Sequence, residues 1–288
     1  MELQEITVEG RHSQDMPWAE TIVMPLGDLQ YGSEGSDLDL FKKYIDWGVA
    51  HDAYYILMGD LVDVLSPSGR TKVKSANFYD SVEAAISEIV TQHEDKVIGL
   101  LKPTRGRVLG VLRGHHYTSH LDSTESDTRI AQALEAPFLG DCGMIRLKFQ
   151  HDTSKASPSI VIWCHHGHGS GQLASSPLNK LEKLTAYFEA DIYMIAHFSR
   201  QGILPIQRLY MSGRRPLKLR HRTKLLVATG AYVRGYTQGS KKGNLPSGSY
   251  IEKGLMSPTA IGSPFITLTP QHSNDEDRVL VGGSILEL

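Results

Sequence analysis

Five short apolar runs constrain the fold of this chain more than any other feature, because each one ends beside an aspartate or a histidine. Apolar runs of this length, separated by amphipathic stretches, predict β-strands that alternate with helices. In an open parallel sheet, ligands bind beyond the carboxyl ends of the strands. We therefore expect these polar side chains to meet at one sheet edge. The runs cover residues 21–26, 54–58, 108–112, 159–164 and 192–196.

The residues that follow the runs are of types that bind metals or transfer protons. A single Gly-Asp after a strand is usually a turn, and a single histidine is usually a packing residue that makes a hydrogen bond. Five such endings in chain order indicate a shared site instead. They supply, in order, Asp28 and Gln30, Asp60 and Asp63, His115 and His116, His165, His166 and His168, and His197, Ser199 and Arg200.

The stretches between the runs predict connecting helices. Residues 37–51 follow Ser36, which we expect to be the N-cap. Apolar spacing predicts further helices over residues 76–101, 126–135 and 177–190. The span 235–249 is rich in Gly, Ser and Lys, and it predicts a mobile loop.

The composition is that of a globular protein, and we expect a cytoplasmic one. Hydrophobic residues make up 40% of the 288-residue chain and charged residues 22%, which is ordinary for a chain with a packed core. No apolar run approaches the ~20 residues of a membrane helix, and the first residues lack the apolar segment of a signal peptide. Cys142 and Cys164 are too few for a disulfide framework, so we expect reduced thiols.

Positive charge is concentrated in one segment. Residues 192–251 contain eleven Lys or Arg residues and no Asp or Glu, although the net charge of the chain is −2. This asymmetry predicts a polyanionic partner. Tyrosines between the basic residues favour a nucleic acid or a nucleotide, because bases stack on aromatic rings. The alternative is that these side chains lie on solvated strands and loops and are balanced by acids elsewhere; the sequence leaves both open.

The ordered motifs resemble those of the calcineurin-like metallophosphoesterases. That superfamily carries D-x-H, G-D-x-x-D, G-N-H-D/E, a histidine often followed by Gly-His, and G-H-x-H. The matching positions here are 28–30, 59–63, 114–117, 166–168 and 196–199. The similarity covers about residues 20–200. It implies one domain over residues 1–288, in which residues 201–288 add a basic sheet and loops. The implied fold is α/β, a four-layer α/β/β/α sandwich of two mixed sheets flanked by helices.

Four positions depart from the superfamily pattern. Gln30 and Ser199 stand where histidines are usual, and those two positions normally serve the same metal. His115 replaces an asparagine, and Tyr117 replaces the acid that normally follows the catalytic histidine. The resemblance therefore implies a metal site with an altered set of ligands.

The resemblance also implies two divalent ions, with Asp60 bridging them. Imidazole nitrogens suit Mn, Fe or Zn, whereas oxygen ligands favour Mn²⁺ or Mg²⁺ and bind more weakly. We therefore expect manganese, with one site weaker than the other. One ion would take Asp60, His115, His166 and His197, and the other would take Asp28, Gln30, Asp60 and Ser199.

By resemblance, His116 stabilises the transition state or protonates the leaving oxygen. Because Tyr117 is not an acid, the carboxylate partner of His116 must come from elsewhere, and Asp122 and Asp127 are the candidates by sequence proximity. Asp63 is expected to support a ligand or to cap a helix.

Two further choices concern the fourth and fifth motifs. His165 competes with His166 for the ligand role, and we favour His166 because it directly precedes Gly-His. His168 and Arg200 are expected to bind the substrate phosphate.

The implied activity is hydrolysis of phosphoesters by a metal-activated water. We expect a phosphodiesterase or nuclease that acts on nucleic acid or nucleotides. One alternative is a phosphomonoesterase for proteins or small molecules. Another is a non-catalytic binding module on the same fold, which the four departures keep open although the retained aspartates and histidines speak against it.

Overall fold

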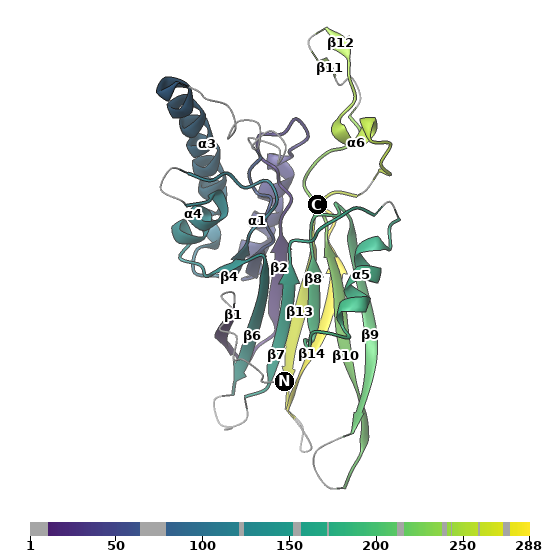
Figure 1. Cartoon of the computed structure of the whole chain (residues 1–288). Helices are drawn as coiled ribbons and strands as arrows, with labels where there is room; N and C mark the ends of the chain where they lie inside the picture. The colour runs from purple at the N-terminus through teal and green to yellow at the C-terminus, as the bar shows by residue number, and fades with distance from the viewer. Residues whose placement is uncertain are drawn as a thin grey trace, which may run out of the picture.

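The computed structural model shows two six-stranded sheets packed face to face (Figure 1). It describes residues 11–63, 79–120, 124–151, 157–171, 173–211, 216–237, 241–242, 244–258, 260–272 and 277–288.

The first sheet has the strand order β14-β13-β2-β3-β4-β5. Its strands are β2 (Thr21–Leu26), β3 (Tyr54–Leu57), β4 (Val108–Leu112), β5 (Phe138–Gly140), β13 (Pro264–Gln271) and β14 (Arg278–Ile285). Strands β2 to β5 are parallel neighbours, whereas β13 runs antiparallel to both β2 and β14. Every residue of β4 is buried, as expected for a parallel strand that is covered on both faces.

The second sheet has the order β1-β6-β7-β8-β10-β9. Its strands are β1 (Arg11–Pro17), β6 (Cys142–Gln150), β7 (Ser159–His165), β8 (Ile192–Ile195), β9 (Gln201–Met211) and β10 (Leu219–Thr229). Strand β8 pairs in parallel with β7 and β10, and β9 and β10 form a long antiparallel hairpin. A short ladder, β11 (Lys241–Lys242) with β12 (Leu245–Pro246), lies at the opposite end of the molecule from that hairpin (Figure 1).

Helices cover the outer faces of both sheets. They are α1 (Leu38–Ala50), α3 (Asp80–Leu101), α4 (Ser126–Ala133), α5 (Ser176–Leu184) and the 3₁₀ turn η1 (Lys102–Thr104). The short α6 (Tyr250–Lys253) lies beyond the end of the sheets, next to the β11–β12 ladder (Figure 1). Phe41 of α1, Val97 of α3 and Ile130 of α4 pack on the first sheet, and Leu181 of α5 packs on the second. None of the helices in the described ranges is long and apolar enough to cross a membrane.

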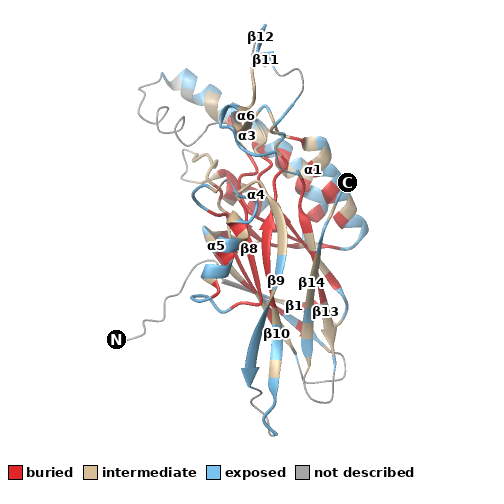
Figure 2. Cartoon of the chain, turned by 90° about the vertical axis from the view of Figure 1, so that its right-hand side faces the viewer, coloured by how far each residue is buried: buried red, intermediate tan, exposed pale blue. Residues whose placement is uncertain are grey.

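The main core lies between the two sheets, where buried residues are dense (Figure 2). Ile56 and Leu109 of the first sheet and Ile145, Ile162 and Leu225 of the second belong to this one apolar cluster. Helix, sheet, sheet and helix therefore form four layers, which confirms the expected α/β/β/α architecture.

The five strands predicted from the apolar runs are all present, but they do not share one sheet. Strands β2, β3 and β4 belong to the first sheet, whereas β7 and β8 belong to the second. The second sheet is also not purely C-terminal, because β1 and β6 are part of it. A fully buried apolar run looks the same in either sheet, so only tertiary pairing could separate them.

Two helix boundaries differ from the expectation. Asp37 caps α1 instead of Ser36: the Asp37 carboxylate accepts the Leu40 N–H at 3.1 Å, while the Ser36 hydroxyl donates to the Leu29 carbonyl at 2.8 Å. Helix α5 ends at Leu184, six residues before the predicted end. Residues 76–78 of the helix predicted over 76–101, and residues 238–240 and 243 of the predicted loop, lie outside the described residues.

The inter-sheet core generates a stability prediction. Ile145 is completely buried there, so Ile145→Ala should lower the free energy of unfolding by about 2–5 kcal/mol in urea denaturation. Val49→Ala is the control, because Val49 is 44% exposed and its change should stay within about 0.5 kcal/mol. Equal effects of the two substitutions would contradict the assignment of Ile145 to the core.

Candidate metal centre

Four side chains from both sheets converge where their strands end. Asp60, His115, His166 and His197 each offer one ligand atom, and these atoms lie within 4.8 Å of one another. Asp60 and His115 follow β3 and β4 of the first sheet, while His166 and His197 follow β7 and β8 of the second. A cluster of one carboxylate and three imidazoles is a set that could bind a metal ion.

The Asp60 carboxylate is fixed by one oxygen and leaves the other available. Its Oδ1 accepts the backbone N–H of His116 at 2.8 Å. Its Oδ2 is buried and lies 3.1 Å from His166 Nε2. A buried carboxylate oxygen in this state is costly unless a cation faces it.

The hydrogen bonds of His166 define which ring nitrogen faces Asp60. His166 Nδ1 lies 2.7 Å from the Met58 carbonyl. Because a carbonyl only accepts, Nδ1 carries the proton, and a neutral ring then has its lone pair at Nε2. This is how second partners usually orient a metal-binding histidine. The buried Asp60 Oδ2 and His166 Nε2 therefore fit a metal ion.

The pKa shifts of Asp60 and His166 also favour a positive charge between these two side chains. Burial lowers the pKa of His166, but the Asp60 carboxylate outweighs it and raises the pKa to about 9. Burial likewise raises the pKa of Asp60, but His166 and His116 hold it below its usual range. In the metal-free protein a proton therefore stays between these two side chains, in the position that suits a cation.

His115 and His197 complete the cluster as neutral rings. Their Nδ1 atoms lie 3.2 Å apart, and His197 Nε2 lies 2.9 Å from the Gly169 carbonyl. The His197 proton is therefore on Nε2, which leaves the Nδ1 lone pair facing the cluster. Burial, helped by His166 and His197, lowers the pKa of His115 to about 4. A ring that is neutral at pH 7 is ready to bind a metal.

Backbone strain is concentrated at the same strand ends. Eight non-glycine residues among those described have a positive φ, and five of them are predicted site residues: Asp28, Gln30, Asp60, His197 and Ser199. A left-handed conformation costs roughly 1–2 kcal/mol for most L-residues, and such strain tends to collect at functional sites. Hydrogen bonds between neighbouring strand ends stabilise these strained turns; for example, the Asp28 N–H donates to the Gly59 carbonyl at 3.0 Å.

Gly114 lets the third strand end approach Asp60 closely. A Cβ at this position would lie 2.1 Å from both the nitrogen and Oδ1 of Asp60. The Gly114 N–H donates to Asp127 Oδ2 at 2.9 Å, so the buried Asp127 holds this turn from below. Glycine is therefore required for the turn that carries His115 and His116.

Asp28 lies beside the four-residue cluster. It is buried, and its Oδ2 accepts the His197 N–H at 2.8 Å. Burial, with a smaller contribution from Asp60, raises the pKa of Asp28 to about 7. Asp28 thus positions the turn that carries His197.

The carboxylate partner of His116 is Asp63, and the expectation of Asp127 is wrong. His116 Nδ1 lies 3.0 Å from Asp63 Oδ1, whereas Asp127 is occupied by the Gly114 N–H. Asp122 lies outside the described residues. Proximity in the sequence does not predict this partner, because Asp63 follows β3 whereas His116 follows β4. Burial lowers the pKa of His116, but Asp63 and Asp60 outweigh it and raise it.

The remaining predicted residues lie around the cluster. His165 Nδ1 accepts the Gly167 N–H at 2.7 Å within its own turn, and His166 is the member of the cluster. His168 is exposed, and its ring centre lies 5.5 Å from that of His115. Gln30, Ser199 and Arg200 are half-buried in the turns that carry Asp28 and His197.

Comparisons with known proteins add little to this geometry. No family model matches the chain, and no curated protein does. Among solved structures, vacuolar protein sorting 29 from Cryptosporidium parvum is 14% identical, with a TM-score of 0.33, over 92% of this chain and 98% of that one. A double mutant of Vps29 from Entamoeba histolytica is 12% identical, with a TM-score of 0.24, over 67% of this chain and 88% of that one. Both likenesses are too weak to assign a function.

The close approach at Gly114 generates a prediction about metal affinity. Gly114→Ala should displace Asp60 and weaken Mn²⁺ binding by about 10- to 100-fold, as measured by calorimetric titration. Gly99→Ala is the matched control, since a Cβ there meets nothing within 4 Å. Unchanged Mn²⁺ affinity in a folded Gly114→Ala protein would contradict the proposed role of Asp60.

Asp127 generates a prediction about pH. Burial raises its pKa to about 7 in the folded protein, from about 3.9 in an unfolded chain. Between these values the folded state holds a proton that the unfolded state lacks, so Asp127 makes stability fall as pH rises. Asp127→Asn should make the change in stability from pH 4 to pH 7 less negative by up to about 1.4 kcal/mol per pH unit. Parallel urea-denaturation profiles of the two proteins across this range would refute the assignment.

Proposed function

We propose that this chain is a metal-dependent phosphoesterase whose centre is the Asp60, His115, His166 and His197 cluster. The observation that carries the proposal is the pair of buried atoms Asp60 Oδ2 and His166 Nε2, which lie 3.1 Å apart where the two sheets meet. Two more imidazoles within ligand distance make a cation the natural occupant.

A divalent ion bound there would polarise a phosphoryl oxygen and lower the pKa of an attacking water. His116 would give a proton to the leaving oxygen. Its pKa is raised by Asp63 and Asp60, which favours the protonated ring, and Asp63 orients it through Nδ1. His116 Nε2 then lies on the side of the cluster, 3.9 Å from Asp60 Oδ2.

We further propose a second, weaker divalent site made by Asp28, Gln30, Asp60 and Ser199, with manganese as the metal. Oxygen ligands support Mn²⁺ or Mg²⁺ there. Asp28 contributes a buried carboxylate next to the turn of His197. Gln30 lies in the turn that carries Asp28, and Ser199 lies in the turn that carries His197. Both residues have a left-handed backbone conformation, as Asp28, Asp60 and His197 do.

The substrate that we favour is a phosphodiester of a nucleic acid or nucleotide, bound through His168 and Arg200. Exposure of His168 beside His115 supports contact with a phosphate. Two basic residues of segment 192–251 support the alternative, in which acids elsewhere in the chain neutralise this positive charge. Arg222 pairs with Asp191 at 2.7 Å, and Lys224 pairs with Glu189 at 2.7 Å. Lys241 and Lys242 lie on β11, at the opposite end of the molecule from the β9–β10 hairpin (Figure 1).

A specific observation favours a second candidate, a non-catalytic metal-binding module. The cluster has four protein ligands, and four ligands can close a tetrahedral site without an open position. Such a metal would stabilise the junction of the two sheets and leave no room for substrate.

Location in the cytoplasm is part of the proposal. Cys142 and Cys164 are free thiols, which suits a reducing compartment.

Hydrolysis of bis- and mono-(p-nitrophenyl) phosphate with Mn²⁺ tests the proposal. Asp60→Asn should reduce the rate by at least about 100-fold, because it removes the carboxylate that faces the cation. Asp39→Asn is the control, since Asp39 is exposed on α1, and its rate should be unchanged. Faster hydrolysis of the diester would support the phosphodiesterase. Mn²⁺ binding without hydrolysis of either compound would favour the binding module instead.

A further inference from the structure

Helix α5 packs on the outer face of the second sheet, the sheet whose strand ends carry His166 and His197. The buried side chains of Pro177 and Leu181 hold this helix on the sheet. Lys180 directly precedes Leu181 and is exposed, so its stem lies at the border between the sheet and solvent. A long side chain in this position can bring its charged end to the strand ends while staying in contact with water.

The Lys180 ammonium contacts both of the segments that follow β7 and β8. Its Nζ donates to the carbonyl of His168, two residues after His166. The same ammonium lies 5.0 Å from the ring centre of Phe198, the residue after His197. At this distance a cation is attracted to the face of an aromatic ring. Lys180 therefore connects the segment that carries His166 to the segment that carries His197.

The segment 167–171 is packed tightly between α5 and the turn of His197. A Cβ on Gly171 would lie 2.4 Å from the Cβ of Ser176, the first residue of α5. A Cβ on Gly167 would lie 2.9 Å from the Cβ of His197. Both glycines are needed because only a residue without a side chain allows such close approach. A shift of this segment relative to α5 would therefore also shift His197.

The same segment orients the His197 ring. The carbonyl of Gly169 accepts the His197 Nε2 proton at 2.9 Å, and this bond directs Nδ1 of the ring toward His115. The two carbonyls involved belong to adjacent residues: Lys180 bonds that of His168, and His197 bonds that of Gly169. Because partners of this kind set the direction of a metal-binding imidazole, Lys180 acts on His197 through this short piece of main chain.

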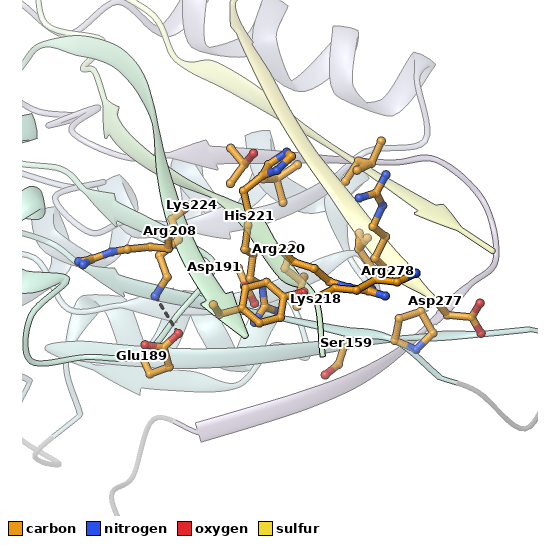
Figure 3. Close-up of a pocket in the computed structure, with 18 of the residues that line it drawn as sticks. Ser159, Glu189, Asp191, Arg208, Lys218, Arg220, His221, Lys224, Asp277 and Arg278 are labelled. Carbon is orange, nitrogen blue, oxygen red and sulfur yellow. Dashed lines mark hydrogen bonds and ion pairs between the residues drawn. The ribbon is translucent and has the colours of Figure 1, made fainter. Parts of the chain in front are cut away.

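The bonding of Lys180 differs from that of another lysine on the second sheet. Lys224 of β10 lines a cavity of about 960 Å³, and its Nζ lies 2.7 Å from Glu189 Oε1 (Figure 3). That contact is an ion pair between two side chains. Lys180 bonds a main-chain carbonyl instead, so removal of its ammonium acts on the position of the backbone beside a candidate ligand.

We propose that Lys180 is a positioning residue, which holds segment 167–169 against the His197 ring and thereby sets the metal affinity of the cluster. The inference rests on the proposed metal centre and adds to it a residue from a helix, outside the motifs at the strand ends. Without the ammonium, the His168 carbonyl loses its donor and the neighbouring Gly169 carbonyl is held less firmly. The His197 ring then samples more orientations, and ordering it on metal binding lowers the affinity.

Calorimetric titration with Mn²⁺ tests the proposal. Lys180→Met keeps an apolar stem but removes the donor and the charge, and it should weaken Mn²⁺ binding by about 5- to 10-fold, because Lys180 acts one contact further out than the partner of a ligand. Lys180→Arg restores a donor and a cation that stacks on aromatic rings, so its affinity should return to within about twofold of that of the unmodified protein. Lys183→Met is the matched control, because Lys183 is exposed on the same helix, and its affinity should be unchanged.

Amide hydrogen exchange of the metal-free protein separates positioning from a general loss of stability. Exchange at Gly167 and Gly169 should be at least about fivefold faster in Lys180→Met, whereas exchange in β7 and the midpoint of urea denaturation should be unchanged. A lower urea midpoint in Lys180→Met, with faster exchange throughout the second sheet, would assign Lys180 a structural role and overturn the proposal.

The titration also distinguishes this inference from the metal centre on which it rests. Equal Mn²⁺ affinity of Lys180→Met and the unmodified protein would overturn the role of Lys180 and leave the metal centre unaffected. Affinity of Lys180→Arg as low as that of Lys180→Met would overturn that role too. No binding of Mn²⁺ by the unmodified protein would overturn the metal centre, and this inference with it.

Discussion

The contact between the Asp60 carboxylate and the His166 ring is the interaction on which the site depends. Both groups are buried, and their facing atoms lie 3.1 Å apart. A negative charge at this depth is stable only beside a positive one. Without metal, the proton on His166 supplies that charge, as its raised pKa shows. A bound metal ion would take its place, and Asp60 and His166 would then be two of its ligands.

The two-sheet architecture brings these groups together. Asp60 and His115 come from one sheet, and His166 and His197 come from the other. The apolar core between the sheets fixes the spacing of the strand ends. Strained turns at Asp28, Asp60 and His197 then aim the side chains inward. Packing energy from the core offsets this local strain.

Much of the fold and of the site could be predicted from the sequence. The runs at 21–26 and 108–112 coincide with β2 and β4, because apolar residues bounded by Gly and polar residues carry a strong local signal. The same signal, repeated at five strand ends, located Asp60, His115, His166 and His197. The motif includes Gly114, but the reason for a glycine there is its close approach to Asp60, which only the three-dimensional structure shows.

What the sequence could not supply was pairing between distant residues. Nothing local distinguishes Asp63 from Asp127 as the partner of His116, since the choice depends on where two strand ends meet. The division of five similar strands between two sheets has the same cause.

Anomalous diffraction from crystals grown with Mn²⁺ tests the central claim most directly. We predict a manganese peak at coordination distance, about 2.0–2.3 Å, from Asp60 Oδ2, His166 Nε2 and the rings of His115 and His197. The contradicting result is a map with no peak among these four side chains at saturating Mn²⁺.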